Sequence, residues 1–157
     1  MKIKCILKTQ GFDFSFYFFK SKNLPDGVNS IVTFVGDDNL KNISIKSPVF
    51  FVYFSDLQRL IGYLEERIFS LESTPKSELC TFVTYALKFQ IKALSGEICS
   101  EISGDSYFGI QCMLKPETSS NNVGNTYLGG ESNITLENAQ NFVSSLRTAI
   151  ANLADSC

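Results

Sequence analysis

The chain has 157 residues, with 44% hydrophobic and 19% charged side chains, 14 phenylalanines and a formal net charge of −2. This composition is typical of one globular domain with a sizeable core, and it excludes an intrinsically disordered chain. Nucleic-acid-binding proteins usually carry a basic surplus, so the slight acidity argues against a nucleic-acid partner. The sequence has neither an apolar stretch long enough to cross a bilayer nor the apolar core of a signal peptide, so we expect a cytoplasmic protein without membrane contact.

Alternating apolar and polar residues predict strands through the first third of the chain. Residues 2–8 fit a strand with one face in solvent, and residues 12–19 fit a second strand. One face of the second strand consists of Phe12, Phe14, Phe16 and Phe18. We interpret this face as core; the alternative, an exposed aromatic platform for single-stranded nucleic acid, is disfavoured by the acidic balance. Further strands are expected at residues 28–35, 40–46 and 49–54, the last of them buried on both faces or at the centre of a sheet.

An amphipathic helix is predicted over residues 55–71. Its apolar stripe consists of Leu57, Leu60, Ile61, Leu64, Ile68 and Leu71. Either Ser55 or Asp56 can cap the first turn, because a side-chain oxygen there can accept an unpaired backbone N–H. Gly62 costs roughly 1 kcal/mol relative to alanine inside a helix, so we expect another group to approach the helix closely there. Arg67 lies off the stripe and is expected in solvent with the other polar residues.

The clearest strand pattern in the chain follows this helix, at residues 83–93. It belongs to a three-strand meander expected over residues 79–114, with turns at Ser95-Gly96 and at residues 104–106. Meanders of this kind are antiparallel, so we expect a largely antiparallel sheet.

The C-terminal part of the chain is predicted to end in a second amphipathic helix. Residues 126–128 are expected as a short edge strand, and Gly129-Gly130 as a turn. Thr135 then caps a helix over residues 136–153. The chain shows neither an internal repeat nor a linker that would divide it. The sequence therefore predicts a single α+β domain over residues 1–157, with two helices packed on a largely antiparallel sheet.

Much catalytic chemistry is absent from the sequence. The chain contains no histidine, which removes the Ser-His-Asp triad, the Cys-His dyad and histidine-bound zinc. The five cysteines are far apart in the sequence, so we expect reduced thiols and no metal site. There is no glycine-rich phosphate loop. We therefore expect a protein without cofactor or catalytic activity, the alternative being a histidine-free enzyme that uses converging carboxylates.

Acidic side chains are the candidate contact residues. Glu65 and Glu66 are adjacent on the polar side of the first predicted helix. Glu97 and Glu101 are four residues apart and share one face of a predicted strand, and Asp105 follows in the next turn. A solvated surface is the simpler interpretation of these carboxylates. The functional interpretation is an acidic patch that binds a protein.

The order of elements from residue 49 onward also resembles a known family. An apolar strand is followed by the helix SDLQRLIGYLEERI, by TYALKFQIKALSGEI and FGIQCML, and then by a loop and ITLENAQNFVSSLRTAI. This order is similar to that of small bacterial immunity-type proteins of the WapI kind, although such domains often carry a tryptophan and this chain has none.

The resemblance implies a cytosolic, non-catalytic protein that neutralises a bacterial toxin by direct binding. A basic toxin domain would suit the mild acidity of the chain, because charge complementarity speeds association. Under this interpretation the contacts are Glu65, Glu66, Glu97, Glu101 and Asp105. The alternative is a subunit or adaptor of a larger assembly, including a phage-encoded inhibitor.

Overall fold

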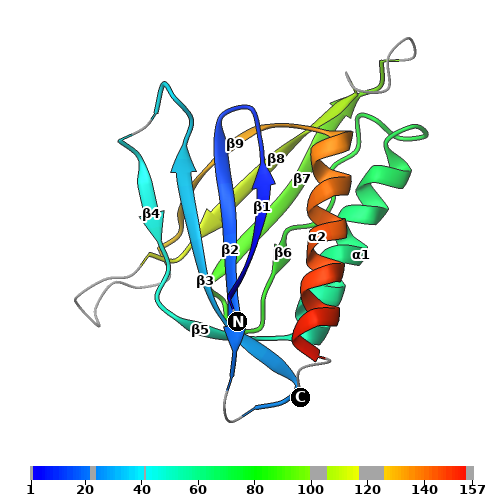
Figure 1. Ribbon diagram of the computed structural model, residues 1–157. Coiled ribbons are helices and arrows are strands. Elements are labelled where there is room, and N and C mark those ends of the chain that lie inside the picture. The colour runs from blue at the N-terminus through cyan, green and yellow to red at the C-terminus, as the bar shows by residue number, and fades with distance from the viewer. Residues whose placement is uncertain (1, 22–23, 41, 100–105, 117–125, 155–157) are drawn as a thin grey trace.

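The computed structural model describes residues 2–21, 24–40, 42–99, 106–116 and 126–154. These residues form two antiparallel sheets and two long helices (Figure 1). The strands are β1 (Lys2–Lys8), β2 (Phe12–Lys20), β3 (Gly27–Gly36), β4 (Ser44–Lys46), β5 (Phe50–Tyr53), β6 (Phe82–Val83), β7 (Phe89–Glu97), β8 (Tyr107–Leu114) and β9 (Leu128–Thr135). The helices are α1 (Phe54–Ser70) and α2 (Leu136–Ala154).

Sheet A is built from the first five strands. β1, β2 and β3 form an antiparallel meander, in which Phe16 pairs with Cys5 on one side and Val32 on the other. β4 and β5 both pair with β3, at two successive stretches of the same strand. This register places the buried apolar residues of β1, β2 and β3 on one face, because side chains alternate along a strand.

Sheet B is the antiparallel meander β6-β7-β8-β9. The pairing of β7 with β8 is irregular between Ala93 and Gly96, where one strand carries extra residues. β9 runs directly into α2, just as β5 of sheet A runs directly into α1. Each helix is therefore a continuation of a strand, and the two helices come from different sheets.

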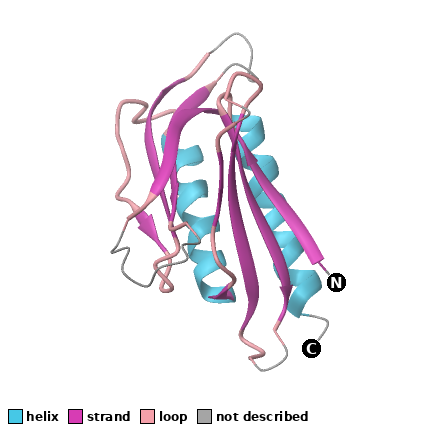
Figure 2. Ribbon diagram, turned by 90° about the vertical axis from the view of Figure 1, so that its left-hand side faces the viewer, coloured by secondary structure: helices cyan, strands magenta, loops and turns pink. Residues whose placement is uncertain are grey.

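One continuous core joins the two sheets and the helices. Phe16 of sheet A meets Phe89 of sheet B edge-on, with ring centroids 5.1 Å apart, and lies 5.5 Å from the Phe142 ring of α2. Figure 2 shows both helices on one side of the strands. Aromatic rings thus carry the contacts between layers, and each buries a large apolar area.

Much of the predicted fold is confirmed. The four-phenylalanine face of β2 is core, since its side chains are at most 3% exposed. The α+β class and both helices are also as predicted, and Thr135 caps α2 by accepting a hydrogen bond from the Asn138 backbone N–H. The strands, however, form two sheets and not one.

Several local predictions are wrong. The strand expected at residues 83–93 is interrupted by a turn that holds Leu87 at a φ of 51°, so β6 and β7 are separate. Gly129 and Gly130 lie within β9 and do not form a turn, because they pair with Met113 and Cys112 of β8. β5 has Tyr53 in solvent, and among the described strands it pairs with β3 alone. It is therefore neither buried on both faces nor at the centre of its sheet.

The turn expected at Ser95-Gly96 is also not found, since both residues belong to β7. The turn predicted at residues 104–106 falls mainly outside the described residues. Within the described part of the chain, neither helix is long and apolar enough to cross a membrane.

Candidate functional site

The two helices lie side by side and run in opposite directions (Figure 1). Each turns an apolar stripe toward the sheets, where Leu57, Leu60 and Leu64 of α1 and Phe142 and Leu146 of α2 are buried. The stripes recur every three or four residues, so the opposite side of each helix stays polar and outward. Between these outward sides the surface is hollowed.

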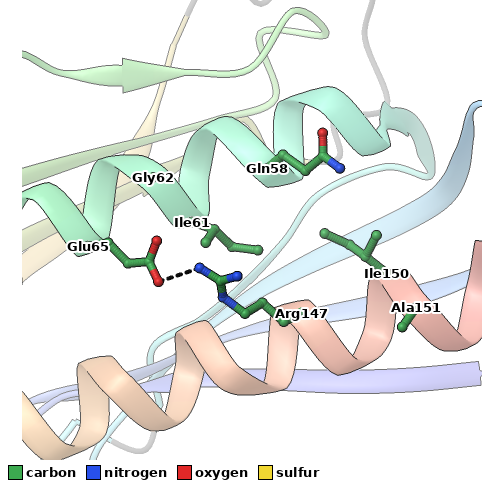
Figure 3. A pocket seen from close by; sticks show the side chains of 7 residues that line it. All are labelled: Gln58, Ile61, Gly62, Glu65, Arg147, Ile150 and Ala151. Carbon is green, nitrogen blue, oxygen red and sulfur yellow. Dashed lines mark hydrogen bonds and ion pairs between the residues drawn. The ribbon is translucent and has the colours of Figure 1, made fainter.

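This hollow, which we call the helix groove, is the candidate functional site. Its first half has a volume of about 420 Å³ and is lined by Gln58, Ile61, Gly62, Glu65, Arg147, Ile150 and Ala151 (Figure 3). Its second half has a volume of about 370 Å³ and is lined by Glu65, Ile68, Phe69, Gln140, Val143, Ser144 and Arg147. The groove therefore follows both helices along their length.

An ion pair spans the groove where its two halves meet. Arg147 Nη2 of α2 donates to Glu65 Oε1 of α1 at 2.5 Å, and Figure 3 shows the two side chains reaching toward each other. Both side chains remain about half-exposed, at 58% for Arg147 and 46% for Glu65. Water therefore screens this pair, and an incoming charge can compete for either partner.

The rest of the groove is largely apolar. Phe69 is 87% exposed at its rim, which makes it the most exposed of the large hydrophobic residues described. Phe69 lies one helical turn beyond Glu65, so the two side chains share one face of α1. At Gly62, the described part of the chain leaves nothing within 4 Å of the position a Cβ would occupy. The expectation that another part of the chain packs closely on Gly62 is therefore wrong, and this residue opens the groove.

A buried carboxylate holds the start of α1. Asp56 does not cap the helix as predicted, since the N-cap residue is Tyr53 and no side chain caps the first turn. Asp56 is 1% exposed; its Oδ1 accepts from Arg59 Nη1 at 2.6 Å and its Oδ2 accepts from the Tyr85 backbone N–H at 2.9 Å. It thus ties α1 to the turn that precedes β7.

A buried arginine holds the other end of α1. Arg67 is fully buried, and the prediction that it lies in solvent is wrong. Its Nη1 donates to the Thr74 carbonyl at 3.2 Å and to Ser77 Oγ at 3.3 Å, and its Nη2 donates to the Pro75 carbonyl at 2.9 Å. Burial lowers the pKa of Arg67 below its ordinary value. The two terminal nitrogens of Arg67 thus tie α1 to the loop that follows it, while its buried Nε has no hydrogen-bond partner among the described residues.

The acidic residues expected as contacts are not gathered at one place. Glu65 lies in the groove and Glu66 is exposed beside it on α1. Glu97 ends β7 and lines a different, shallow cavity, and its charge raises the pKa of the neighbouring Tyr107. Glu101 and Asp105 lie outside the described residues.

Sequence reasoning missed two residues of the groove. Phe69 is an apolar residue that falls off the buried stripe of α1, and this misplacement is a signal visible in the sequence. Arg147 carries no comparable signal, because a single basic residue on a helix surface is ordinary. Its position opposite Glu65 depends on how the helices pack.

The described residues include carboxylates and cysteines, which could form a metal-binding group or supply a reactive thiol. They contain no group of three or more Cys, Asp or Glu side chains placed to hold a metal ion. Burial raises the pKa of the Cys112 thiol well above its ordinary value, and the pKa of Cys5 is raised as well. Both thiols are thus protonated near neutral pH, and a protonated thiol is a poor nucleophile.

A scan of the sequence against protein-family models finds no match, and a search of curated proteins finds no similar sequence. Function is therefore inferred from the helix groove itself.

Proposed function

We propose that this protein is a non-catalytic inhibitor of the immunity type, which neutralises a bacterial toxin by binding it through the helix groove. The observation that carries the proposal is the exposed Phe69 at the rim of an open, largely apolar groove. An aromatic ring held in solvent is costly in water, and such rings are enriched where proteins bind each other.

The open, elongated shape of the groove fits a protein partner, although each half alone has the volume of a small-molecule pocket. Its two halves are open hollows that adjoin along the helices, with volumes of about 420 and 370 Å³. A partner can lay an extended or helical segment along such a groove and insert apolar anchors into each half.

The charges of the groove favour a basic residue on the partner. Among the described residues, Glu65 is held by the solvent-screened pair with Arg147 alone, and Glu66 is exposed next to it. A lysine or arginine of the partner can take Glu65 from Arg147 when the groove is covered and water is excluded. A basic toxin domain meets this requirement.

An inhibitor of this kind acts in the cytoplasm of the cell that carries the toxin gene. The described cysteines are compatible with a reducing compartment, because Cys5, Cys80, Cys99 and Cys112 are all free.

Gly62 offers the sharpest test of the groove. The Gly62→Arg variant places a long side chain in the first half of the groove, where the described residues leave open space, so it should block a partner without disturbing the core. Gly62→Ala is the matched control, because a methyl group leaves the groove open. Each protein is purified and titrated by calorimetry with the product of each neighbouring open reading frame.

The expected result is a complex with one toxin-like product. Gly62→Arg should raise the Kd by at least 100-fold, which corresponds to about 2.7 kcal/mol, while Gly62→Ala should bind like the unaltered protein. When each variant is co-expressed with the toxin, Gly62→Arg should protect the cells poorly, and Gly62→Ala should protect them as well as the unaltered protein does. If every neighbouring product leaves the calorimeter trace flat, or if Gly62→Arg binds as tightly as Gly62→Ala, the proposal fails.

A further inference from the structure

A second surface lies on sheet A, on the face turned away from the core. One row of cross-strand partners there consists of Lys2, Phe19, Asn29 and Phe51, from β1, β2, β3 and β5 in turn. Lys4 and Tyr17 form the neighbouring row. Together these six residues make what we call the lysine–aromatic face. We infer that the lysine–aromatic face binds single-stranded nucleic acid.

The rings of Phe19 and Phe51 are the ones on this face that can stack with a base, because the Tyr17 ring is already covered by two lysine ammonium groups. A Cβ at Gly27 would lie 2.7 Å from Phe51 Cζ, so the tip of the Phe51 ring reaches the backbone of the neighbouring strand. The ring therefore leans along the sheet and does not stand out from it. Phe51, Phe19 and Tyr17 are all partly buried, with part of each side chain in solvent. Aromatic rings placed in this way stack with nucleobases of any sequence.

The lysines of this face supply the charge that phosphates need. Lys2 Nζ and Lys4 Nζ lie 4.7 and 5.4 Å from the centre of the Tyr17 ring, so cations and rings are interleaved. Lys8 and Lys46 are exposed on the same face, where the described strands carry one carboxylate, that of Asp13. The face is thus basic around Lys2 and Lys4, although Lys8 shares a shallow cavity with Asp13, Asp37 and Asp38 and the whole chain has a net charge of −2.

Asn29 lies between the two phenylalanines of the row. Its amide offers both hydrogen-bond donors and an acceptor, which suits the exposed edge of a base stacked on either ring. A row that alternates aromatic, amide and aromatic side chains, with a cation at its end, matches the chemistry of unpaired nucleotides.

Two other partners fit this face less well. Protein interfaces are depleted in lysine, whereas lysine is an ordinary phosphate ligand. Proteins that lie on membranes insert apolar side chains below the headgroups, and a Phe51 ring that leans along the sheet does not protrude for that purpose.

This inference goes beyond the proposed function and concerns another surface. It departs from the sequence-based expectation of no nucleic-acid partner, which used the net charge of the whole chain. The helix groove and the lysine–aromatic face lie on different elements, so each can be disabled alone.

The test is fluorescence anisotropy with labelled oligo-dT of about 12 nucleotides, a length within the ~4–16 nucleotides bound by comparable single-strand sites. Binding should be measurable at about 50 mM salt, with a Kd in the range of ~10⁻⁶ to 10⁻⁴ M, and should weaken steeply at higher salt. Phe51→Leu keeps an apolar side chain against Gly27 but removes the ring, and it should weaken binding by about 5- to 100-fold.

Matched variants separate this site from the rest of the surface. Phe69→Leu removes another exposed ring and should bind like the unaltered protein. Lys4→Gln should make the dependence of log K on log salt shallower by about 0.7, while Lys76→Gln, in the loop after α1, should not change it. Gly62→Arg should leave oligonucleotide binding unchanged. A failure of this inference is therefore distinguishable from a failure of the proposed partner binding at the helix groove.

Three outcomes overturn the inference. The first is an anisotropy that stays flat at high protein concentration and low salt. The second is equal weakening by Phe51→Leu and Phe69→Leu. The third is equal binding to duplex DNA, polyglutamate or anionic vesicles that Phe51→Leu leaves unchanged, since that pattern indicates a general preference for negative charge.

Discussion

Asp56 Oδ2, buried at the start of α1, accepts a hydrogen bond from the backbone N–H of Tyr85 at 2.9 Å. The two residues are 29 positions apart in the chain, so this bond ties the helix to the turn between β6 and β7. The turn is a place of backbone strain, because Leu87 adopts a φ of 51°, which bulky residues rarely adopt.

Replacing Asp56 with alanine should therefore lower the free energy of unfolding by about 2–3 kcal/mol. The change removes the acceptor of the Tyr85 N–H, at a partly buried position, and frees Arg59 from its ion pair. Urea unfolding followed by circular dichroism measures the effect. Glu66→Ala, which alters an exposed carboxylate on the same helix, should change stability by less than about 0.5 kcal/mol. Equal losses in the two variants would show that Asp56 has no special structural role.

Arg67→Met should also destabilise the protein, by about 2–3 kcal/mol. Methionine fills the space but removes the three hydrogen bonds that the guanidinium donates to the loop. The Thr74 carbonyl still accepts from Ser77, and the Pro75 carbonyl still accepts from the Gly96 N–H. The loop after α1 should become sensitive to limited proteolysis at the same time, because the arginine fork holds it. Arg147→Met, at a half-exposed position, serves as control and should cost less than about 0.5 kcal/mol. An unchanged proteolysis pattern in Arg67→Met would contradict this account of the loop.

Gly62→Ala should stabilise the protein by about 0.5–1 kcal/mol. Alanine lowers the entropy of the unfolded chain and is a better helix former, and the described residues leave nothing within 4 Å to obstruct its methyl group. Thermal unfolding provides the measurement. Gly27→Ala is the contrasting variant, because a Cβ there would lie 2.3 Å from the Val52 carbonyl oxygen and should destabilise β5. A loss of stability in Gly62→Ala would mean that the groove is closed at this point.

The ion pair between Glu65 and Arg147 should contribute little to stability. Both side chains are about half-exposed, so a double-mutant cycle with alanine should give a coupling of at most about 0.5 kcal/mol, which decreases with added salt. The affinity for a partner that covers the groove should fall far more in Glu65→Ala than the stability of the free protein does. A coupling above about 2 kcal/mol in the free protein would instead make the pair a structural clamp.

Stability should fall as the pH rises above about 9, the ordinary pKa of a thiol. Burial raises the pKa of Cys112 and Cys5 in the folded state, so the unfolded chain releases these protons first. Their contribution is complete below pH 9 and is lost as the pH rises toward the folded-state pKa, by up to ~1.4 kcal/mol per pH unit for each thiol. Because the chain has no histidine, stability should stay nearly flat between about pH 6 and 8.

Urea unfolding at stepwise pH measures this dependence. Cys112→Ala should show a shallower decline above pH 9 than the unaltered protein, whereas Cys80→Ala, at an exposed position, should not. If the free energy of unfolding falls equally steeply in Cys112→Ala, the loss of stability at alkaline pH comes from other groups. One such group is Tyr63, whose pKa is also raised by burial.

The regular elements of this fold were predictable because their patterns are local. The phenylalanines of β2 alternate, and the stripes of α1 and α2 repeat at helical spacing, so periodicity alone identifies their buried faces. The division into two sheets was not predictable in this way, because it depends on which strands pair across long distances in the chain. Gly129 and Gly130 show the same limit: their composition indicates a turn, but pairing with β8 keeps them extended.

The candidate site was predictable only in part. Glu65 was identified as an exposed acid on α1, but the groove around it requires the antiparallel packing of α2. Arg67 follows Glu66 directly and has the polarity of a surface residue, yet it is buried and donates to the loop after α1. The local pattern predicts which polar residues face solvent, whereas tertiary structure decides which of them are buried with hydrogen-bond partners in the core.

The direct passage of β5 into α1 and of β9 into α2 has a mechanical consequence. No loop separates strand from helix in either case. The α1 wall of the groove is therefore attached to sheet A, and the α2 wall is attached to sheet B. The width of the groove is then set by the angle between the sheets, and a change in one requires a change in the other. A partner wedged between the helices should therefore slow amide hydrogen exchange in strands far from the contact, in both sheets at once.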